Sequence, residues 1–232
     1  MNSQVVFHKV GHRGAPREFP ANTLRSFSRA MEYGCTMVEC DIRAAADGEL
    51  VLAHDPEAAA GGKRYAITEH DSAFLARLDL GAGEGVPKLS ALATLLKDRC
   101  AIMADMKCEG GDIERKVIEA LSSLSVESKL VPGAGTESRK RFRETDSSLP
   151  LSLSLGAFQM KESEFEEILS NLDTQAVTWE HPLLTSERIS ALHSRGVAVY
   201  AWTVDDFPTM LRLQEMGVDG IISNRCDLLA KL

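Results

Sequence analysis

Short apolar segments alternate with helical patterns along almost the whole chain, and this alternation constrains the fold more than any other feature. The apolar segments are VVFHKV, TMVECDI, LVLAHD, CAIMADMK, KLVPG, PLSLSL, AVTWE, VAVYAWTV and GIIS. A parallel pair of strands needs a crossover of a dozen or more residues, and a helix is the usual crossover. The alternation therefore predicts parallel strands joined by helices.

Four of the intervening segments have the apolar spacing and the end signals of helices. They are NTLRSFSRAMEYG, KESEFEEILSNL, TSERISALHSRG and DFPTMLRLQEMG. In the first segment, Asn22 is the expected N-cap and Gly34 the expected end. In the second, Ser163 and Glu166 have the spacing of a capping box.

One pair of apolar segments departs from this alternation. Only a few residues separate CDI from LVLAH, and the Asp47-Gly48 pair among them is a strong tight-turn signal. These two segments should therefore form an antiparallel hairpin excursion after the second strand. Eight strands then remain, and with their helices in a chain of 232 residues they predict a (β/α)8 TIM barrel, with a doubly wound open sheet as the alternative.

The chain shows no internal repeat, low-complexity tract or interdomain linker. We therefore expect a single domain over residues 1–232. The glycine-rich stretches AAAGGKR and LGAGEGVP are interpreted as surface loops of that domain.

Charge and cysteine content limit the partners. The net charge of -8 opposes binding to nucleic acid or to an anionic membrane, so we expect a small-molecule ligand held at a local positive site. The five scattered cysteines favour reduced thiols, and no apolar run approaches the ~20 residues that span a bilayer. A cytoplasmic protein without a stable membrane anchor is the expectation; the sequence leaves the oligomeric state open.

Two carboxylates and two histidines are predicted to meet near the carboxyl ends of the first strands. Side chains alternate along a strand, so Glu39 and Asp41 point the same way and can share one hard cation. The hairpin returns His54 to the level of Asp41, and His12 ends the neighbouring first strand. Active sites of such barrels lie at this end of the strands.

These residue types suit hydrolysis of a phosphodiester. The reaction needs a base for the attacking oxygen, an acid for the leaving oxygen and positive charge on the phosphoryl oxygens. His12 and His54 are the candidate acid and base. Arg13 and Lys107 are the candidate phosphate-binding groups, and a divalent metal on the carboxylates would neutralise further charge.

The ordered set of motifs resembles the glycerophosphodiester phosphodiesterase family. The resemblance rests on three tripeptides and on two stretches near the C-terminus, VYAWTVDD and GVDGIISNRCDLL. The tripeptides are His12-Arg13-Gly14, Glu39-Cys40-Asp41 and His54-Asp55-Pro56. This resemblance implies a metal-dependent hydrolase that converts glycerophosphodiesters to glycerol 3-phosphate and an alcohol.

The resemblance also implies a third metal ligand, and the aligned triplet places it at Asp105, where the family usually has glutamate. Glu39, Asp41 and Asp105 would hold Mg²⁺ or Ca²⁺, because hard cations prefer oxygen ligands. A second departure lies before the first helix, where the usual Pro-Glu-Asn-Thr is Pro20-Ala21-Asn22-Thr23. Both departures leave open a lysophospholipase D-like or other phosphodiesterase, or a barrel that binds phosphorylated ligands without activity.

Further polar residues are ambiguous by sequence alone. Glu180 and Trp202 lie at late strand ends and are candidate substrate contacts. His8, His70 and His193 are interpreted as surface or rim groups. The basic run over residues 139–143 is interpreted as the solvated face of a helix.

Overall fold

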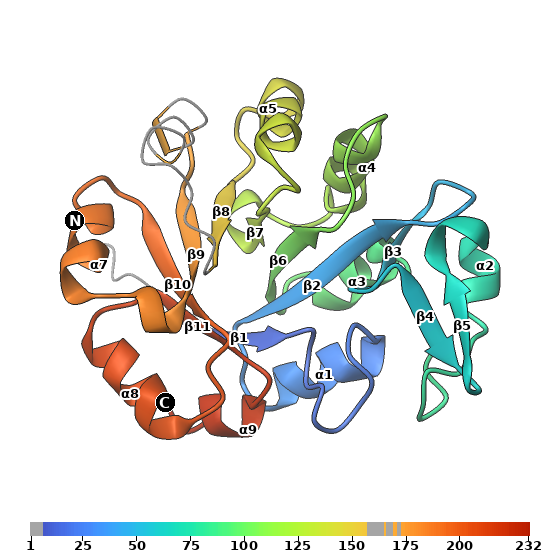
Figure 1. The fold of residues 1–232 in the computed structure, drawn as a ribbon, viewed down its shortest axis with the longest axis horizontal. Helices are drawn as coiled ribbons and strands as arrows, with labels where there is room; N and C mark the ends of the chain where they lie inside the picture. Colours follow the sequence, from blue (N-terminus) through green and yellow to red (C-terminus); the bar gives the residue numbers. More distant parts are fainter. Residues whose placement is uncertain (1–6, 157–164, 166–168, 171–172) are drawn as a thin grey trace.

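Eight parallel strands form a nearly closed barrel in the computed structural model, which describes residues 7–156, 165, 169–170 and 173–232 (Figure 1). In spatial order the strands are β7 (Lys129–Leu130), β6 (Ala101–Met106), β2 (Met37–Ala44), β1 (His8–His12), β11 (Gly220–Ser223), β10 (Ala198–Trp202), β9 (Ala176–Glu180) and β8 (Ser152–Leu155). A parallel bridge between Val131 and Leu151 joins the two ends of this order. The predicted barrel is confirmed, and the open-sheet alternative is wrong.

Helices cover the outside of the strands, as Figure 1 shows. They are α1 (Leu24–Glu32), α3 (Leu89–Leu96), α4 (Ile113–Ala120), α5 (Thr136–Thr145), α7 (Ser186–His193), α8 (Phe207–Glu215) and α9 (Cys226–Leu229). Outward strand residues such as Val38, Ile102 and Val177 pack against these helices. Among the described helices, none combines the length and the apolarity needed to cross a bilayer.

One apolar cluster lies between the strands and the helices, and a second fills the interior of the barrel. Its buried members are Val10, Met37, Met103, Leu130, Ala176, Tyr200 and Ile222. These residues come from seven different strands, because alternate side chains of each strand point inward. The lower part of the barrel interior is therefore packed with apolar side chains.

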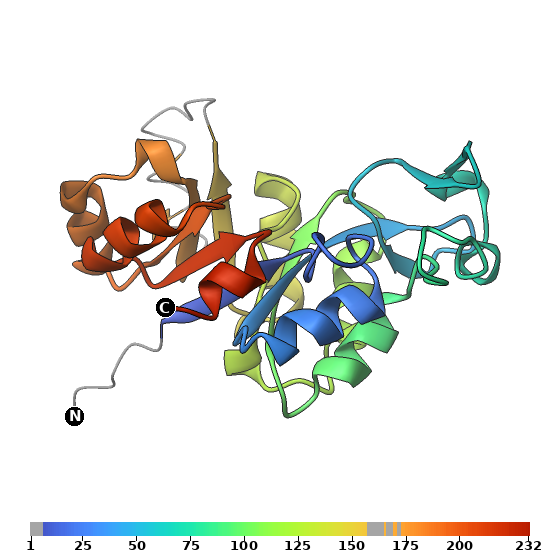
Figure 2. The ribbon, with the colours of Figure 1, turned by 90° about the horizontal axis from the view of Figure 1, so that it is seen from below.

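The excursion after β2 contains the predicted hairpin and one that the sequence interpretation missed. Strand β3 (Leu50–Leu52) pairs antiparallel with β2, as expected. The stretch interpreted as a surface loop, AAAGGKR, instead joins β4 (Glu57–Ala60) and β5 (Lys63–Ala66) in an antiparallel pair. Both turn glycines, Gly61 and Gly62, have positive φ, which matches a two-residue hairpin turn. Figure 2 shows this excursion, with the short α2 (Ser72–Leu75), projecting to one side of the barrel.

The start of α1 differs from the prediction. Its N-cap is Thr23, whose hydroxyl accepts from the backbone N–H of Ser26 at 3.3 Å. Asn22 cannot cap the helix because it has a φ of 62° and its amide is engaged by Asp41. The predicted end holds, since Gly34 has a φ of 82° just after the C-cap Tyr33. The helix predicted over residues 161–172, with its Ser163–Glu166 capping box, lies mostly outside the described residues.

The basic run of α5 is only partly a solvated face, since the Lys140 side chain is partly exposed but its neighbours make specific contacts. Arg139 is buried and its Nε donates to the backbone carbonyl of Ser152 at 3.1 Å. Arg141 donates to the carboxylates of Glu109 and Glu114. Hydrogen bonds from these guanidinium groups to specific carbonyls and carboxylates hold α5 to its neighbours, which the spacing of charges along one helix cannot reveal.

Candidate active site

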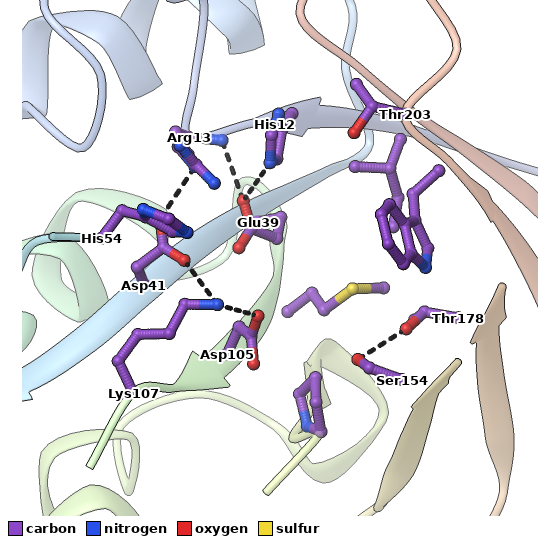
Figure 3. A pocket seen from close by; sticks show the side chains of 14 residues that line it. His12, Arg13, Glu39, Asp41, His54, Asp105, Lys107, Ser154, Thr178 and Thr203 are labelled. Atoms are coloured by element: carbon purple, nitrogen blue, oxygen red, sulfur yellow. Dashed lines mark hydrogen bonds and ion pairs between the residues drawn. The ribbon is translucent and has the colours of Figure 1, made fainter. Parts of the chain in front are cut away.

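A cavity of about 320 Å³ opens at the carboxyl ends of the strands (Figure 3). It has a charged side, formed by β1, β2, β6 and the residues that follow them, and a side without charged groups. The lining residues are His12, Arg13, Glu39, Asp41, His54, Met103, Asp105, Lys107, Pro132, Ser154, Thr178, Trp202, Thr203 and Ile222. The residues predicted as acid, base, cation ligands and phosphate contacts thus line one cavity, and of the two further candidate substrate contacts Trp202 lines it and Glu180 does not.

Three carboxylates meet on the charged side. Glu39 and Asp41 are alternate residues of β2, and Asp41 is in register with Asp105 on the adjacent β6. One oxygen from each lies within 4.8 Å of the others. Burial raises the pKa of the Glu39 carboxyl well above its ordinary value, and the charges of Asp41 and Asp105 raise it further. Three clustered, largely buried carboxylates fit a divalent cation, which would relieve this repulsion.

Two cationic side chains neutralise part of this charge. Arg13 Nε lies 2.9 Å from Asp41 Oδ2, and Lys107 Nζ lies 3.1 Å from the other oxygen, Oδ1. Lys107 Nζ also lies 2.7 Å from Asp105 Oδ2. Figure 3 shows the guanidinium and the ammonium directed toward Asp41 from two sides. Positive charge therefore stands beside the carboxylates at the mouth of the cavity, where an anionic ligand would meet it.

The backbone at Arg13 is held in an uncommon conformation. Its φ is 56°, a left-handed value that few residues other than glycine adopt. The backbone N–H of Arg13 donates to the carbonyl oxygen of Glu39 and to Glu39 Oε2, each at 3.0 Å. These bonds fix the start of the loop after β1, and with it the direction of the Arg13 side chain.

His12 lies at the end of β1, largely buried between β2 and β11. Its Nδ1 lies 2.8 Å from Asn224 Oδ1, and its Nε2 lies 3.8 Å from Glu39 Oε2. Burial lowers the pKa of His12 and the nearby Arg13 lowers it further; these effects outweigh the hydrogen bond to Asn224 and the nearby carboxylates. The neutral imidazole is therefore favoured.

His54 is more exposed than His12. It follows β3, and its Nδ1–H donates to Asp55 Oδ1 at 2.8 Å, which lowers the pKa of the Asp55 carboxyl. The Arg43 guanidinium donates to the backbone carbonyl of His54 and anchors this turn to β2. The hairpin thus delivers His54 to the cavity at the level of Asp41, as its length predicts, and leaves the ring partly open to solvent.

The uncharged side of the cavity carries hydroxyl and indole groups. Ser154 Oγ on β8 lies 2.8 Å from Thr178 Oγ1 on β9. Trp202, at the end of β10, lines the cavity as predicted, and its buried Nε1–H has no hydrogen-bond partner among the residues that the structure describes. Unpaired buried donors are uncommon, so this N–H is available to a ligand. Glu180, at the end of β9, does not line the cavity as described, and its contact with substrate remains a prediction.

Asn22 is the most direct contact that the sequence interpretation missed. Its Nδ2 donates to Asp41 Oδ2 at 2.8 Å, and its Oδ1 accepts from the backbone N–H of Asp41 at 3.1 Å. The Pro-x-Asn-Thr motif was the available signal, but it was interpreted as a helix start. Ala21 beside it is exposed and is not among the cavity-lining residues.

Asn224, Asp205, Ser154 and Thr178 were also missed. Asp205 and Asn224 lie just beyond the ends of β10 and β11, whereas Ser154 and Thr178 lie within β8 and β9, and their places on these late strands are the only signal for them. The histidines interpreted as surface or rim groups do lie elsewhere: His70 stacks on Phe74, and His193 Nε2–H donates to Asp219 Oδ2 at 2.8 Å.

Comparison with known proteins agrees with this geometry. A curated glycerophosphodiester phosphodiesterase of Caldanaerobacter subterraneus subsp. tengcongensis is 26% identical over 241 residues, covering 96% of each chain. The "Probable glycerophosphodiester phosphodiesterase 2" of Mycobacterium tuberculosis is 27% identical over 241 residues, covering 95% of this chain and 88% of that protein.

Solved structures share the fold. An Oleispira antarctica phosphodiesterase, determined in complex with the product sn-glycerol-3-phosphate, matches with a TM-score of 0.86 at 21% identity, over 97% of this chain and 96% of that one. A glycerophosphodiester phosphodiesterase from Agrobacterium tumefaciens matches with a TM-score of 0.82 at 21% identity, over 98% of this chain and 100% of that one.

The family model described as "Glycerophosphoryl diester phosphodiesterase family" matches residues 12–228. This range begins at the histidine that ends β1 and includes every residue that lines the cavity. The sequence resemblance is therefore confirmed, and the chain belongs to the glycerophosphoryl diester phosphodiesterase family of enzymes.

Proposed function

We propose that this enzyme hydrolyses glycerophosphodiesters to glycerol 3-phosphate and an alcohol, with Mg²⁺ or Ca²⁺ held by Glu39, Asp41 and Asp105. The observation that carries the proposal is the meeting of three carboxylates, two cations and two histidines in one cavity. The product complex of the Oleispira antarctica phosphodiesterase supports glycerol 3-phosphate as the product.

The oxygen-rich ligand set supports a hard divalent cation. Glu39, Asp41 and Asp105 supply carboxylate oxygens, and no thiol lines the cavity. When bound, such a cation supplies Lewis-acid stabilisation of the charge that develops on the phosphoryl oxygens. The choice between Mg²⁺ and Ca²⁺ depends on ligand number and flexibility, so a titration must decide it.

Each remaining charged residue has a distinct role in this proposal. Arg13 and Lys107 bind the non-bridging oxygens of the phosphate, because both line the cavity beside the carboxylates. His12 and His54 exchange protons with the attacking and leaving oxygens. His12 accepts the proton of the attacking hydroxyl at Nε2, and His54 protonates the oxygen of the departing alcohol.

The attacking group in this scheme is a hydroxyl of the substrate's own glycerol or a water molecule. In the first case a cyclic phosphate forms, and water then opens it with the proton transfers reversed. The partly open position of His54 suits exchange of its proton with solvent between the two steps. Detection of a cyclic glycerophosphate after a rapid quench would support attack by the glycerol hydroxyl rather than by water.

A substrate panel tests the proposal. The purified protein is incubated with glycerophosphocholine, glycerophosphoethanolamine and glycerophosphoinositol, with lysophospholipids and with a phosphomonoester, each with Mg²⁺, with Ca²⁺ and with a chelator. We expect metal-dependent release of glycerol 3-phosphate from the deacylated diesters and no hydrolysis of the monoester. Greater activity on acyl-bearing diesters would reassign the substrate class, and binding without turnover of any diester would refute hydrolysis.

A further inference from the structure

Asp205 and Asn224 are joined by two hydrogen bonds beside His12. Asp205 follows β10 and Asn224 follows β11. Asp205 Oδ1 accepts from the backbone N–H of Asn224 at 2.8 Å, and Asp205 Oδ2 accepts from Asn224 Nδ2 at 2.8 Å. The hydroxyl of Ser223 lies 3.0 Å from Asp205 Oδ1. Both carboxylate oxygens are thus used to hold Asn224 in place.

The hydrogen bond to Asp205 Oδ2 determines the orientation of the Asn224 side-chain amide. The two ends of an amide are nearly alike in shape, so their hydrogen-bond partners decide its orientation. An ionised carboxylate can only accept, and therefore Nδ2, the donor end, must face Asp205. Asn224 Oδ1 is then left facing His12 Nδ1 at 2.8 Å.

The orientation of the amide in turn decides the tautomer of His12. A carbonyl oxygen can only accept, so the nitrogen that faces it, Nδ1, must carry the proton. In the neutral ring Nε2 then holds a lone pair. Nε2 lies 3.8 Å from Glu39 Oε2, beyond hydrogen-bond distance, and the ring lines the cavity. The lone pair is therefore free to accept a proton from a bound reactant.

We propose that Asp205 is a positioning residue, which acts through the amide of Asn224 to hold His12 in the tautomer that presents a proton acceptor to the cavity. The attacking hydroxyl gives its proton to the Nε2 lone pair, while the Nδ1 proton stays on the bond to Asn224. His12 becomes an imidazolium until it returns that proton. The catalytic consequence rests on the proposed function, whereas the tautomer itself does not.

The substitution Asp205→Asn tests the hydrogen bonds that connect Asp205, Asn224 and His12. The backbone N–H of Asn224 can only donate, so it determines the orientation of the new amide. The new amide at position 205 should keep its oxygen toward that N–H and turn its NH₂ toward the Asn224 side chain. Asn224 must then turn its oxygen toward position 205 and its NH₂ toward His12. His12 Nδ1 becomes an acceptor, and the ring proton moves to Nε2, where it blocks the lone pair.

The double variant Asp205→Asn/Asn224→Asp reverses this change. The carboxylate introduced at position 224 accepts from the new NH₂ at position 205 with one oxygen and from His12 Nδ1–H with the other. The original tautomer should return. Asp206→Asn is the matched control: it makes the same chemical change one residue away, at the N-cap of α8, where asparagine also caps well.

Two measurements decide the proposal in parent, single, double and control proteins. Long-range ¹H–¹⁵N spectra of histidine-labelled protein, assigned with His12→Ala, report which ring nitrogen of neutral His12 is protonated. Steady-state kinetics on the preferred diester report kcat and KM. We expect an Nδ1-protonated ring in the parent, the double variant and the control, and an Nε2-protonated ring in Asp205→Asn with kcat lowered ~10²–10⁴-fold and KM little changed.

An Nε2-protonated ring in the parent, or an unchanged tautomer in a folded Asp205→Asn protein, would overturn the proposal. If Asp205→Asn does not fold, the parent spectrum still tests the proposal, because an Nε2-protonated His12 there would overturn it. Inverted tautomers in a protein that hydrolyses no diester would refute the proposed function alone. A correct tautomer series with unchanged kcat would refute the catalytic consequence for His12.

Discussion

The ammonium of Lys107 lies 2.7 Å from Asp105 Oδ2, two residues earlier in the chain. The two side chains point into the cavity together because alternate residues at the end of a strand share a face. In the proposed site, Lys107 and the metal would therefore share the Asp105 carboxylate.

The first prediction concerns Asp105 as a ligand of the proposed metal. Asp105→Asn should raise the metal concentration for half-maximal rate by ~10-fold or more, because a neutral amide is a weaker ligand than a carboxylate. Asp105→Glu should keep activity with an altered metal requirement. The measurement is a metal titration of the chelator-treated proteins, with the exposed Asp112→Asn as control. A parent-like curve for Asp105→Asn would remove Asp105 from the ligand set.

The second prediction concerns the two histidines of the cavity. His12→Ala and His54→Ala should each lower turnover by ~10²–10⁴-fold, because each removes a proton-transfer group. His70→Ala, on the excursion away from the cavity, is the control. Turnover is measured at saturating metal after circular dichroism confirms folding. Undiminished turnover in both cavity variants would exclude them as acid and base.

The third prediction concerns Asn22, which bonds Asp41 through both ends of its amide. Asn22→Gly removes these bonds but tolerates the φ of 62°. Unfolding free energy in urea should fall by ~1–3 kcal/mol, because the buried Asp41 N–H loses its partner, and activity should fall with it. The control is Asp98→Gly, at an exposed position with a φ of 59°. Equal stability of the two variants would mean that the amide is dispensable.

The fourth prediction is a pH dependence of stability. Burial is the largest single influence on Glu114 and raises its pKa, but the hydrogen bonds that its carboxylate accepts and the charge of Arg141 together outweigh burial, and the net pKa lies below its ordinary value of 4.5. A depressed pKa stabilises the folded state above pH 4.5 and loses that contribution as the pH falls through the folded-state pKa.

Glu114→Gln should therefore lower the unfolding free energy by ~1–3 kcal/mol at pH 7. The difference from the parent should shrink below pH 4.5. Urea unfolding at several pH values measures it, and Glu119→Gln on the exposed face of α4 is the control. A difference that stays constant with pH would show that the charge of Glu114 contributes nothing.

The fifth prediction concerns the uncharged side of the cavity. Ser154→Ala should lower kcat/KM by ~3–10-fold, mainly through KM, because it removes one neutral hydrogen bond to a substrate hydroxyl. Ser152→Ala is a close control, since Ser152 lies two residues earlier on β8, is buried and does not line the cavity. Equal kinetics of both variants with the parent would mean that substrate does not reach β8.

Four residues of the charged side were predictable from strand and hairpin geometry, whereas Asp105 was expected from the family resemblance. The alternation of β2 puts Glu39 and Asp41 on one face, and the length of the hairpin returns His54 to their level. His12 needed only the adjacency of β1 and β2. Each of these inferences uses a period or a turn that neighbouring residues determine.

The missed residues depend on features that no local pattern encodes. Asn22 reaches Asp41 only because its backbone adopts a left-handed φ, and a polar residue before a helix is more readily interpreted as a cap. The burial of Arg139 depends on a carbonyl of β8, and the pairing of Asn224 with His12 joins residues 212 positions apart. Such contacts arise from closure of the barrel.

Because β1 pairs with β11, the barrel can close only after almost the whole chain has been synthesised. The ribosome makes Glu39, Asp41 and His54 early. The hydrogen bond that orients His12 cannot form until Asn224 has been synthesised. Until β11 is made, β1 is an unprotected edge strand with its hydrogen-bonding groups open to other chains. A nascent chain that ends between β10 and β11 therefore lacks the contact that orients His12 and exposes one edge of β1 to other chains.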